Sequence, residues 1–108
     1  MSYNVLSIVV FEKQAKRLLK KYPTLKSELF ELIKSLKENP LQGTLIGKSC
    51  FKIRLAIASK GKGKSGGARI ITNFIISEDT IYLLSIYDKS EKDNLTDKEI
   101  ESLLNFIP

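Results

Sequence analysis

The sequence predicts an α+β fold with an N-terminal strand, a two-helix hairpin, a three-stranded antiparallel meander that joins the first strand in one sheet, and a short C-terminal helix. Apolar residues recur at the spacing of amphipathic helices between residues 11 and 38, whereas after residue 50 they alternate or cluster as in strands. With 108 residues, 43% of them hydrophobic, we expect residues 1–108 to form one domain without a linker.

The first part of the chain predicts a strand followed by two helices. Residues 3–10, YNVLSIVV, are apolar and β-branched and predict the strand. Helical spacing follows over residues 11–21, and Tyr22-Pro23 ends it because proline disfavours helical geometry in the residue before it. A second helix is expected over residues 24–38, up to Asn39-Pro40.

The second part predicts the antiparallel meander. Residues 51–57 alternate, so that Lys52 and Arg54 share the face opposite the apolar side chains. Residues 68–76 and 80–87 are rich in β-branched and aromatic side chains, with a polar turn at residues 77–79 between them.

The terminal helix has a recognisable start. Thr96 and Glu99 match a capping box, and Leu95 and Ile100 match the hydrophobic staple around it. The apolar residues from Ile100 to Ile107 give this helix a face that can dock on the sheet.

Positive charge is concentrated in the middle of the chain. Lysine and arginine total 18 against 12 acidic residues, and no acidic residue occurs between Glu38 and Glu78. A net charge of +6 favours an anionic partner, namely nucleic acid, an acidic protein or an anionic membrane surface. The cations inside the gap are Lys48, Lys52, Arg54, Lys60, Lys62, Lys64 and Arg69.

Residues that the chain lacks exclude several classes of protein. It has no histidine, which excludes histidine-dependent ribonucleases and hydrolases and His-ligated zinc sites. Cys50 is its only cysteine, so an internal disulfide is impossible and a reducing cytosol is the natural compartment. The apolar run 5–11 is too short for a signal peptide or a membrane span. We therefore expect a soluble cytoplasmic protein with no membrane partner.

A glycine- and lysine-rich loop, residues 59–67, separates the first two strands of the meander. Residues 58–65, ASKGKGKS, fit a relaxed phosphate-loop pattern, but a strand rather than a helix follows, so we reject a nucleotide triphosphatase. Two interpretations stay open. The loop is either a hairpin tip that charge keeps soluble, or a mobile arm whose Lys60, Lys62 and Lys64 contact phosphates without reading sequence. The neighbouring strand cations favour the mobile arm.

Cations converge on the predicted sheet. Lys52 and Arg54 share one strand face, Arg69 is on the next strand and Lys89 follows the last. Like charges repel unless an anion is present, so a bound phosphate backbone explains the four cations better than an ordinary solvated face does.

Tyr87 and Asp88 close the last strand. Tyr87 either belongs to the core or stacks on an unpaired base. Asp88 is expected only to begin a turn.

Several signatures in the second part of the chain carry a family resemblance. They are K-I-R, GKGK and GG-x-R-I-I in residues 51–74, FKIRLAIASKGKGKSGGARIITNF, and Y-x-K-x-E in residues 81–100, IYLLSIYDKSEKDNLTDKEI. With them the chain resembles the RelE/HigB superfamily of toxins from type II toxin–antitoxin modules, especially its HigB-like branch. The resemblance is strong over residues 48–95 and looser over the rest.

The resemblance implies a fold, an activity and partners. It implies the RelE-like microbial ribonuclease fold and an endonuclease that cuts mRNA in the ribosomal A site and so inhibits translation. In this family the RNA 2′-hydroxyl attacks its own 3′-phosphate, and no metal or cofactor takes part. The implied partners are the ribosome with its mRNA and a cognate antitoxin, which is expected to carry a DNA-binding domain.

The resemblance also implies roles for individual residues. Arg54 and Arg69 would stabilise charge on the phosphoryl oxygens, and Lys89 or Tyr87 would assist the leaving oxygen. Lys52 would act as base only if neighbouring cations lower its pKa well below about 10.4. The residues expected to bind RNA are Lys48, Lys60, Lys62 and Lys64. Two departures from relatives stand out: no tyrosine follows Tyr87, and an aromatic pair after the arginine strand is replaced by Asn73 and Phe74.

Two other functions remain open from the sequence. One is a non-enzymatic inhibitor on the same fold, like the gyrase-poisoning ParE toxins, in which the basic residues would serve binding alone. The other is a basic nucleic-acid-binding module without toxicity, whose binding to naked RNA would depend strongly on salt.

Overall fold

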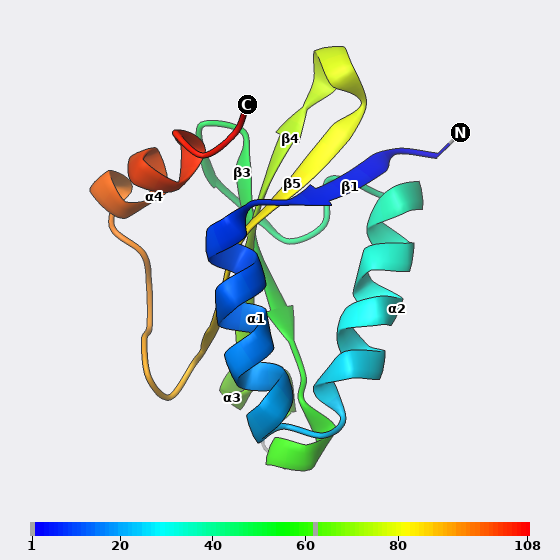
Figure 1. Ribbon diagram of the computed structural model, residues 1–108, viewed down its shortest axis with the longest axis vertical. Coiled ribbons are helices and arrows are strands. Elements are labelled where there is room, and N and C mark those ends of the chain that lie inside the picture. The colour runs from blue at the N-terminus through cyan, green and yellow to red at the C-terminus, as the bar shows by residue number, and fades with distance from the viewer. Residues whose placement is uncertain (1, 62) are drawn as a thin grey trace.

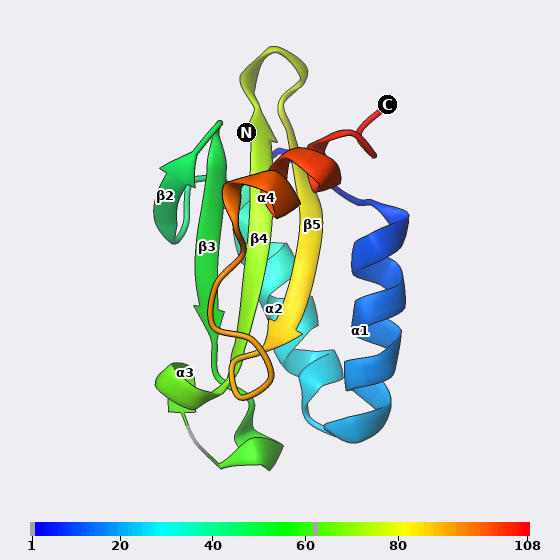
Figure 2. The same cartoon turned by 90° about the vertical axis from the view of Figure 1, so that its left-hand side faces the viewer.

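A computed structural model describes residues 2–61 and 63–108 as one mixed sheet with helices on both faces. The five strands lie in the order β1-β5-β4-β3-β2, with β1 parallel to β5 and the other neighbours antiparallel. Helices α1 and α2 cover one face and α4 lies on the other (Figures 1 and 2). The strands are β1 (Asn4–Ser7), β2 (Thr44–Gly47), β3 (Cys50–Leu55), β4 (Ala68–Ile75) and β5 (Thr80–Asp88). The helices are α1 (Val9–Lys21), α2 (Leu25–Glu38), α3 (Gly63–Gly66) and α4 (Asp97–Leu104), with single 3-10 turns η1 (Ala58–Lys60) and η2 (Ile76–Glu78).

The α+β prediction is confirmed, and its first boundary shifts. The first strand ends at Ser7, and Val9 and Val10 belong to α1 instead of the strand. Ile8 has extended geometry and is 4% exposed, so it fills the junction as a core residue. Strand β1 pairs with β5 over Asn4 to Ser7, and one more backbone hydrogen bond, from Ile8 N to the carbonyl oxygen of Leu83 at 3.2 Å, comes just before α1 begins.

Strand β2 was not predicted. It is a short edge strand with mostly exposed side chains. Gly43 precedes it and Gly47 is its last residue, and they have positive φ angles of 96° and 100°. A Cβ atom at Gly43 would lie 2.4 Å from the carbonyl oxygen of Lys52, so glycine is needed there for the close approach to β3. Because glycine is typical of turns, the glycines at both ends of this short segment do not predict a strand.

The loop between β3 and β4 is more ordered in backbone geometry than we predicted, because it contains η1 and α3. At its base, a Cβ atom on Gly67 would lie 2.1 Å from the carbonyl oxygen of Leu55. Gly67 therefore allows β3 and β4 to meet directly below the loop.

The predicted capping box is present at the start of α4. Glu99 N donates to Thr96 Oγ1 at 3.1 Å, and Thr96 N donates to Glu99 Oε1 at 2.9 Å. Ile100 behind it is 5% exposed and belongs to the core.

The main core lies between the sheet and the α1–α2 pair. Leu18, Leu25 and Leu36 point inward from the helices and have no exposed surface. Ile70 and Ile86 oppose them from neighbouring positions of β4 and β5. Within the described residues, no helix combines the length and apolar character needed to cross a membrane.

We expect Leu18→Ala to lower the free energy of unfolding by about 2–5 kcal/mol, because it removes a fully buried side chain and leaves a cavity. Urea denaturation followed by circular dichroism measures the loss. The matched control is Leu19→Ala on the same helix, where the side chain is only partly buried and the loss should be clearly smaller. Equal losses would contradict this placement of the core.

Candidate functional site

Three predicted site residues form a row across the sheet. Arg54 of β3 pairs with Arg69 of β4, and Arg69 pairs with Tyr87 of β5. Directly opposed residues on antiparallel strands point to the same face, so the three side chains share one side. Lys52 lies on that side because it is two residues from Arg54, and Lys89 follows the end of β5. The structure therefore brings the five predicted catalytic residues to one region.

The row lies on the face that carries α4. Its register neighbours Ile53, Ile70 and Ile86 are buried in the core on the other face, beneath α1 and α2. Lys52 Nζ donates to Asn94 Oδ1 at 2.7 Å, and Asn94 is in the segment that leads to α4. This segment crosses in front of β3 and β4 in Figure 2.

The row residues differ in exposure. Arg54 is exposed, whereas Arg69 is 4% exposed and Tyr87 is 6% exposed. The Arg69 guanidinium donates to the carbonyl oxygen of Ala68 at 3.2 Å. The Tyr87 hydroxyl donates to the carbonyl oxygen of Asp93 at 3.4 Å. Burial raises the pKa of Tyr87 against the opposing effect of Arg69, so its phenol keeps its proton at neutral pH.

We call residues 89–96 the strap, because they run from the end of β5 across the site to α4. Lys89 and Asp93 within it form an ion pair. A hydrogen bond and the positive charge from Lys89 lower the pKa of Asp93, and the charges of Lys52 and Arg69 lower it further. The Asp93 carboxylate therefore lies within the electrostatic reach of three predicted catalytic cations.

Asp88 forms a buried polar junction that the sequence did not predict. Its carboxylate has no exposed surface and accepts hydrogen bonds from Tyr22 Oη at 2.5 Å and from Ser90 N and Oγ at 2.9 and 2.7 Å. Lys60 Nζ also donates to it and forms an ion pair with it. Burial alone would raise the pKa of Asp88, but these hydrogen bonds outweigh burial and bring the pKa well below its ordinary value.

The expected mobile arm is wrong for Lys60. Its side chain is only 9% exposed and is held by Asp88 instead of extending into solvent. A carboxylate without exposed surface needs an adjacent cation, and Lys60 is the buried one, while the more exposed Lys21 ammonium group lies 4.0 Å from the other carboxylate oxygen. Lys62 lies outside the described residues, and the backbone of Lys64 belongs to α3.

Lys48 lies in the turn between β2 and β3, where its φ of 54° is left-handed. Its ammonium group forms an ion pair with Glu101 of α4. Among the described residues, no group of three or more potential side-chain metal ligands comes together.

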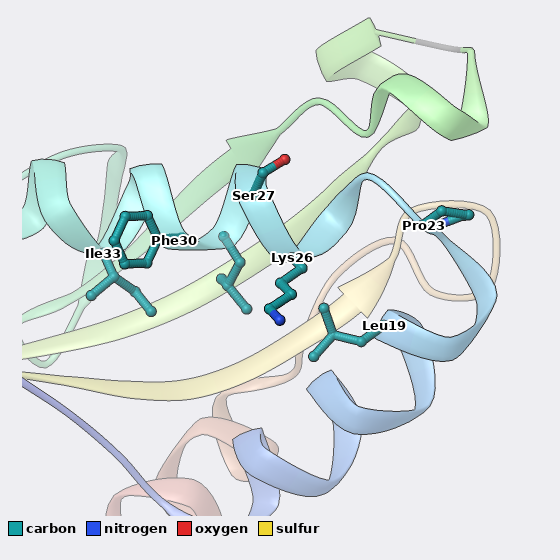
Figure 3. A pocket seen from close by; sticks show the side chains of 7 residues that line it. Leu19, Pro23, Lys26, Ser27, Phe30 and Ile33 are labelled. Atoms are coloured by element: carbon teal, nitrogen blue, oxygen red, sulfur yellow. The ribbon is translucent and has the colours of Figure 1, made fainter.

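A separate apolar hollow lies between α1 and α2, on the other side of the sheet from the row (Figure 3). Phe30, which is 65% exposed, and Ile33 line it from α2, and Leu19 lines it from α1. None of the residues that line this hollow is a predicted site residue.

Comparison with known proteins finds a protein family and solved structures that are similar to this chain. A family model described as the RelE toxin of the RelE/RelB toxin–antitoxin system matches residues 8–106. An E. coli RelE mutant with two arginines replaced by alanine, in the free state, has a TM-score of 0.62 at 18% identity and covers 100% of both chains. Isolated E. coli RelE has a TM-score of 0.59 at 18% identity, covering 98% of this chain and 100% of its own.

A toxin–antitoxin complex gives a further match. The RelBE2 complex of Mycobacterium tuberculosis has a TM-score of 0.59 at 15% identity, covering 82% of this chain and 92% of the matched chain. At such identities the structural likeness concerns the fold, and the family match rests on the sequence of residues 8–106.

We expect Asp88→Asn to lower the free energy of unfolding by about 3–5 kcal/mol at neutral pH, because it leaves the Lys60 ammonium group buried without its counter-charge. The matched control is Asp79→Asn, an exposed turn position with a φ of 49° that asparagine also accepts. Urea denaturation of the three proteins measures the difference.

The same variants test the pH dependence of the junction. The pKa of Asp88 is lower in the folded than in the unfolded chain, so its stabilisation is complete above about pH 3.9 and is lost as the pH falls further. Between pH 4 and 2.5, roughly, the wild type should therefore lose more stability than Asp88→Asn does. Parallel losses in both proteins would contradict the junction.

Proposed function

Since this chain belongs to the RelE toxin family, we propose that it is the toxin of a toxin–antitoxin module and cleaves mRNA on translating ribosomes. The observation that carries the proposal is the row of Arg54, Arg69 and Tyr87, with Lys52 on the same face and Lys89 beside it. Such a cluster suits a polyanionic ligand, and it offers charge stabilisation and proton transfer without histidine.

The proposed reaction is a transesterification within the RNA strand. The 2′-hydroxyl oxygen attacks the adjacent phosphorus, the bond from phosphorus to the 5′-oxygen of the next nucleotide breaks, and the products end in a 2′,3′-cyclic phosphate and a 5′-hydroxyl. Lys52 would accept the proton of the 2′-hydroxyl in its neutral amine form, after its ammonium group has released a proton. Arg54 and Arg69 would stabilise the negative charge that develops on the phosphoryl oxygens.

The leaving 5′-oxygen needs a proton donor. The raised pKa of Tyr87 keeps its phenol protonated, which suits this role, and Lys89 is the second candidate. No step in this scheme requires a metal or a cofactor.

Other cations would contribute to binding. We assign contacts with the RNA backbone to Lys48, Lys62 and Lys64, whereas Lys60 would act through Asp88 by holding the loop that carries the other two lysines. Residues 1–108 would act as one toxin domain in the cytoplasm.

An antitoxin is the proposed protein partner. The description of the matching family and the complex from M. tuberculosis both support it, because each pairs a toxin of this fold with an antitoxin. A DNA-binding domain in that antitoxin remains part of the proposal.

We expect Arg54→Ala to reduce mRNA cleavage by about 10²-fold or more, since one contact to the developing charge is lost. Arg54 is exposed, so the substitution leaves the core intact. Cleavage is measured by primer extension on mRNA after induction, together with growth arrest. The control is Lys13→Ala on α1, which removes an exposed charge on the other side of the sheet and should leave both unchanged.

Arg69 can be tested in the same way. Arg69→Lys keeps the charge at this buried position but loses the planar guanidinium, and it should reduce cleavage while the protein stays folded. Wild-type toxicity in both arginine variants would contradict the assigned site. Growth arrest without new mRNA ends would favour the non-enzymatic, ParE-like alternative.

The identity of the nucleophile, the RNA 2′-hydroxyl, can be tested by removing it from the substrate. An mRNA with a single 2′-deoxynucleotide on the 5′ side of the cut should resist cleavage on programmed ribosomes, because the attacking oxygen is absent. The unmodified mRNA, and one with the deoxynucleotide at the next codon, should be cut equally. Cleavage of the first substrate would show that water attacks instead.

A further inference from the structure

We infer that the strap, residues 89–96, closes the candidate site of the free protein. The Asp93 carboxylate would occupy the position of a substrate phosphate, and the RNA would displace it on binding. The inference rests on the proposed function for the identity of the ligand, an RNA strand. The closed state itself rests on contacts within this chain.

The charges at the site support this closure. Asp93 forms an ion pair with Lys89, and the positive charges of Lys52 and Arg69 also lower the pKa of its carboxyl group. In the proposed reaction, a phosphodiester would contact these same three side chains for charge stabilisation or proton transfer. One carboxylate therefore reduces the repulsion among them in the free protein, as a bound phosphate would.

Burial gives an independent reason. Arg69 and Tyr87 are only 4% and 6% exposed, although the proposed chemistry requires both to contact RNA. The Tyr87 hydroxyl is bonded to the backbone of Asp93, and the Lys52 ammonium group is bonded to the side chain of Asn94. Consecutive strap residues thus occupy two of the proposed proton-transfer groups.

The ends of the strap are held more firmly than its middle. Asp88 anchors the first end through the buried junction, and the capping box of Thr96 and Glu99 fixes the second. Besides the hydrogen bonds from Tyr87 and Lys52, the middle is held by ion pairs of solvent-exposed groups: the side chain of Asp93 is 71% exposed, and Glu91, paired with Arg17, is 45% exposed. Exposed ion pairs contribute little and are screened by salt, so the middle can lift while both ends stay in place.

The first experiment measures the closure without RNA. Tetranitromethane nitrates accessible tyrosines, and mass spectrometry reports the rate at Tyr87, with buried Tyr22 and Tyr82 as internal references. The rate is divided by the fraction of Tyr87 that is ionised, taken from an NMR pH titration of the same variant, because the reagent attacks the phenolate and Asp93 raises the pKa of Tyr87. We expect Asp93→Asn to raise this corrected rate about two- to fivefold, the scale of one exposed ion pair. The matched control is Asp97→Asn in the first turn of α4, which changes the net charge equally and should not alter the rate.

The second experiment adds a short 2′-deoxyoligonucleotide, which cannot be cleaved by attack of a 2′-hydroxyl, at low salt. Asp93→Asn should bind it about two- to fivefold more tightly than Asp97→Asn does. In the wild type, hydrogen exchange of the amides in residues 89–96 should become faster when the oligonucleotide binds, while α1 stays unchanged.

The outcomes separate this inference from the proposed function. Equal nitration of Tyr87 in the two aspartate variants, or slower exchange in the strap when oligonucleotide binds, would overturn the closure. A nitration difference together with no mRNA cleavage on ribosomes would keep the closed strap and reject the nuclease.

Discussion

The buried carboxylate of Asp88 is the interaction on which the arrangement of the site depends. It joins Tyr22 after α1, Lys60 in the 3-10 turn after β3, and Ser90 at the start of the strap. A charge without exposed surface is stable only while such partners surround it, so the three segments are fixed relative to one another. Because Asp88 is the last residue of β5, the junction also sets where that strand ends and where the strap begins.

More of the positive charge on this chain is paired with carboxylates than its composition suggests. The acid-free region from residue 39 to 77 meets the acidic region from residue 88 to 101 in space. The pairs that join or reinforce them are Lys60 with Asp88, Lys48 with Glu101, Lys89 with Asp93 and Lys92 with Glu99. The C-terminal region therefore acts as a counter-charge to the sheet, and the remaining excess is spread over other surfaces, including α1.

Local patterns predicted much of this structure. The second helix and the capping box of α4 follow from spacing and side-chain chemistry within a few residues, and both are present. The convergence of strand cations was also expected, and Arg54 and Arg69 do lie side by side. The position of Tyr87 next to Arg69 comes from the register of β4 and β5, which the sequence did not predict. The family resemblance supplied the roles proposed for these residues, which the register alone does not.

Other features depend on contacts between residues that are far apart in the sequence, which local patterns do not predict. Tyr22 and Asp88 are 66 residues apart, and Tyr22 next to a proline gave no sign of a polar role. Lys60 sat among glycines and so predicted an exposed arm, although burial with Asp88 decides its position. Strand β2 needs two glycines with positive φ and has no apolar pattern to mark it.

The parallel pairing of β1 with β5 has a consequence for folding during synthesis. Residues 4–7 leave the ribosome before the other strands of the sheet, yet their partners are residues 80–83. Until most of the chain has been made, α1 and α2 have no complete sheet to cover, and their apolar stripes stay exposed. The native sheet is thus completed late, and the nascent chain lacks an assembled site for most of its synthesis.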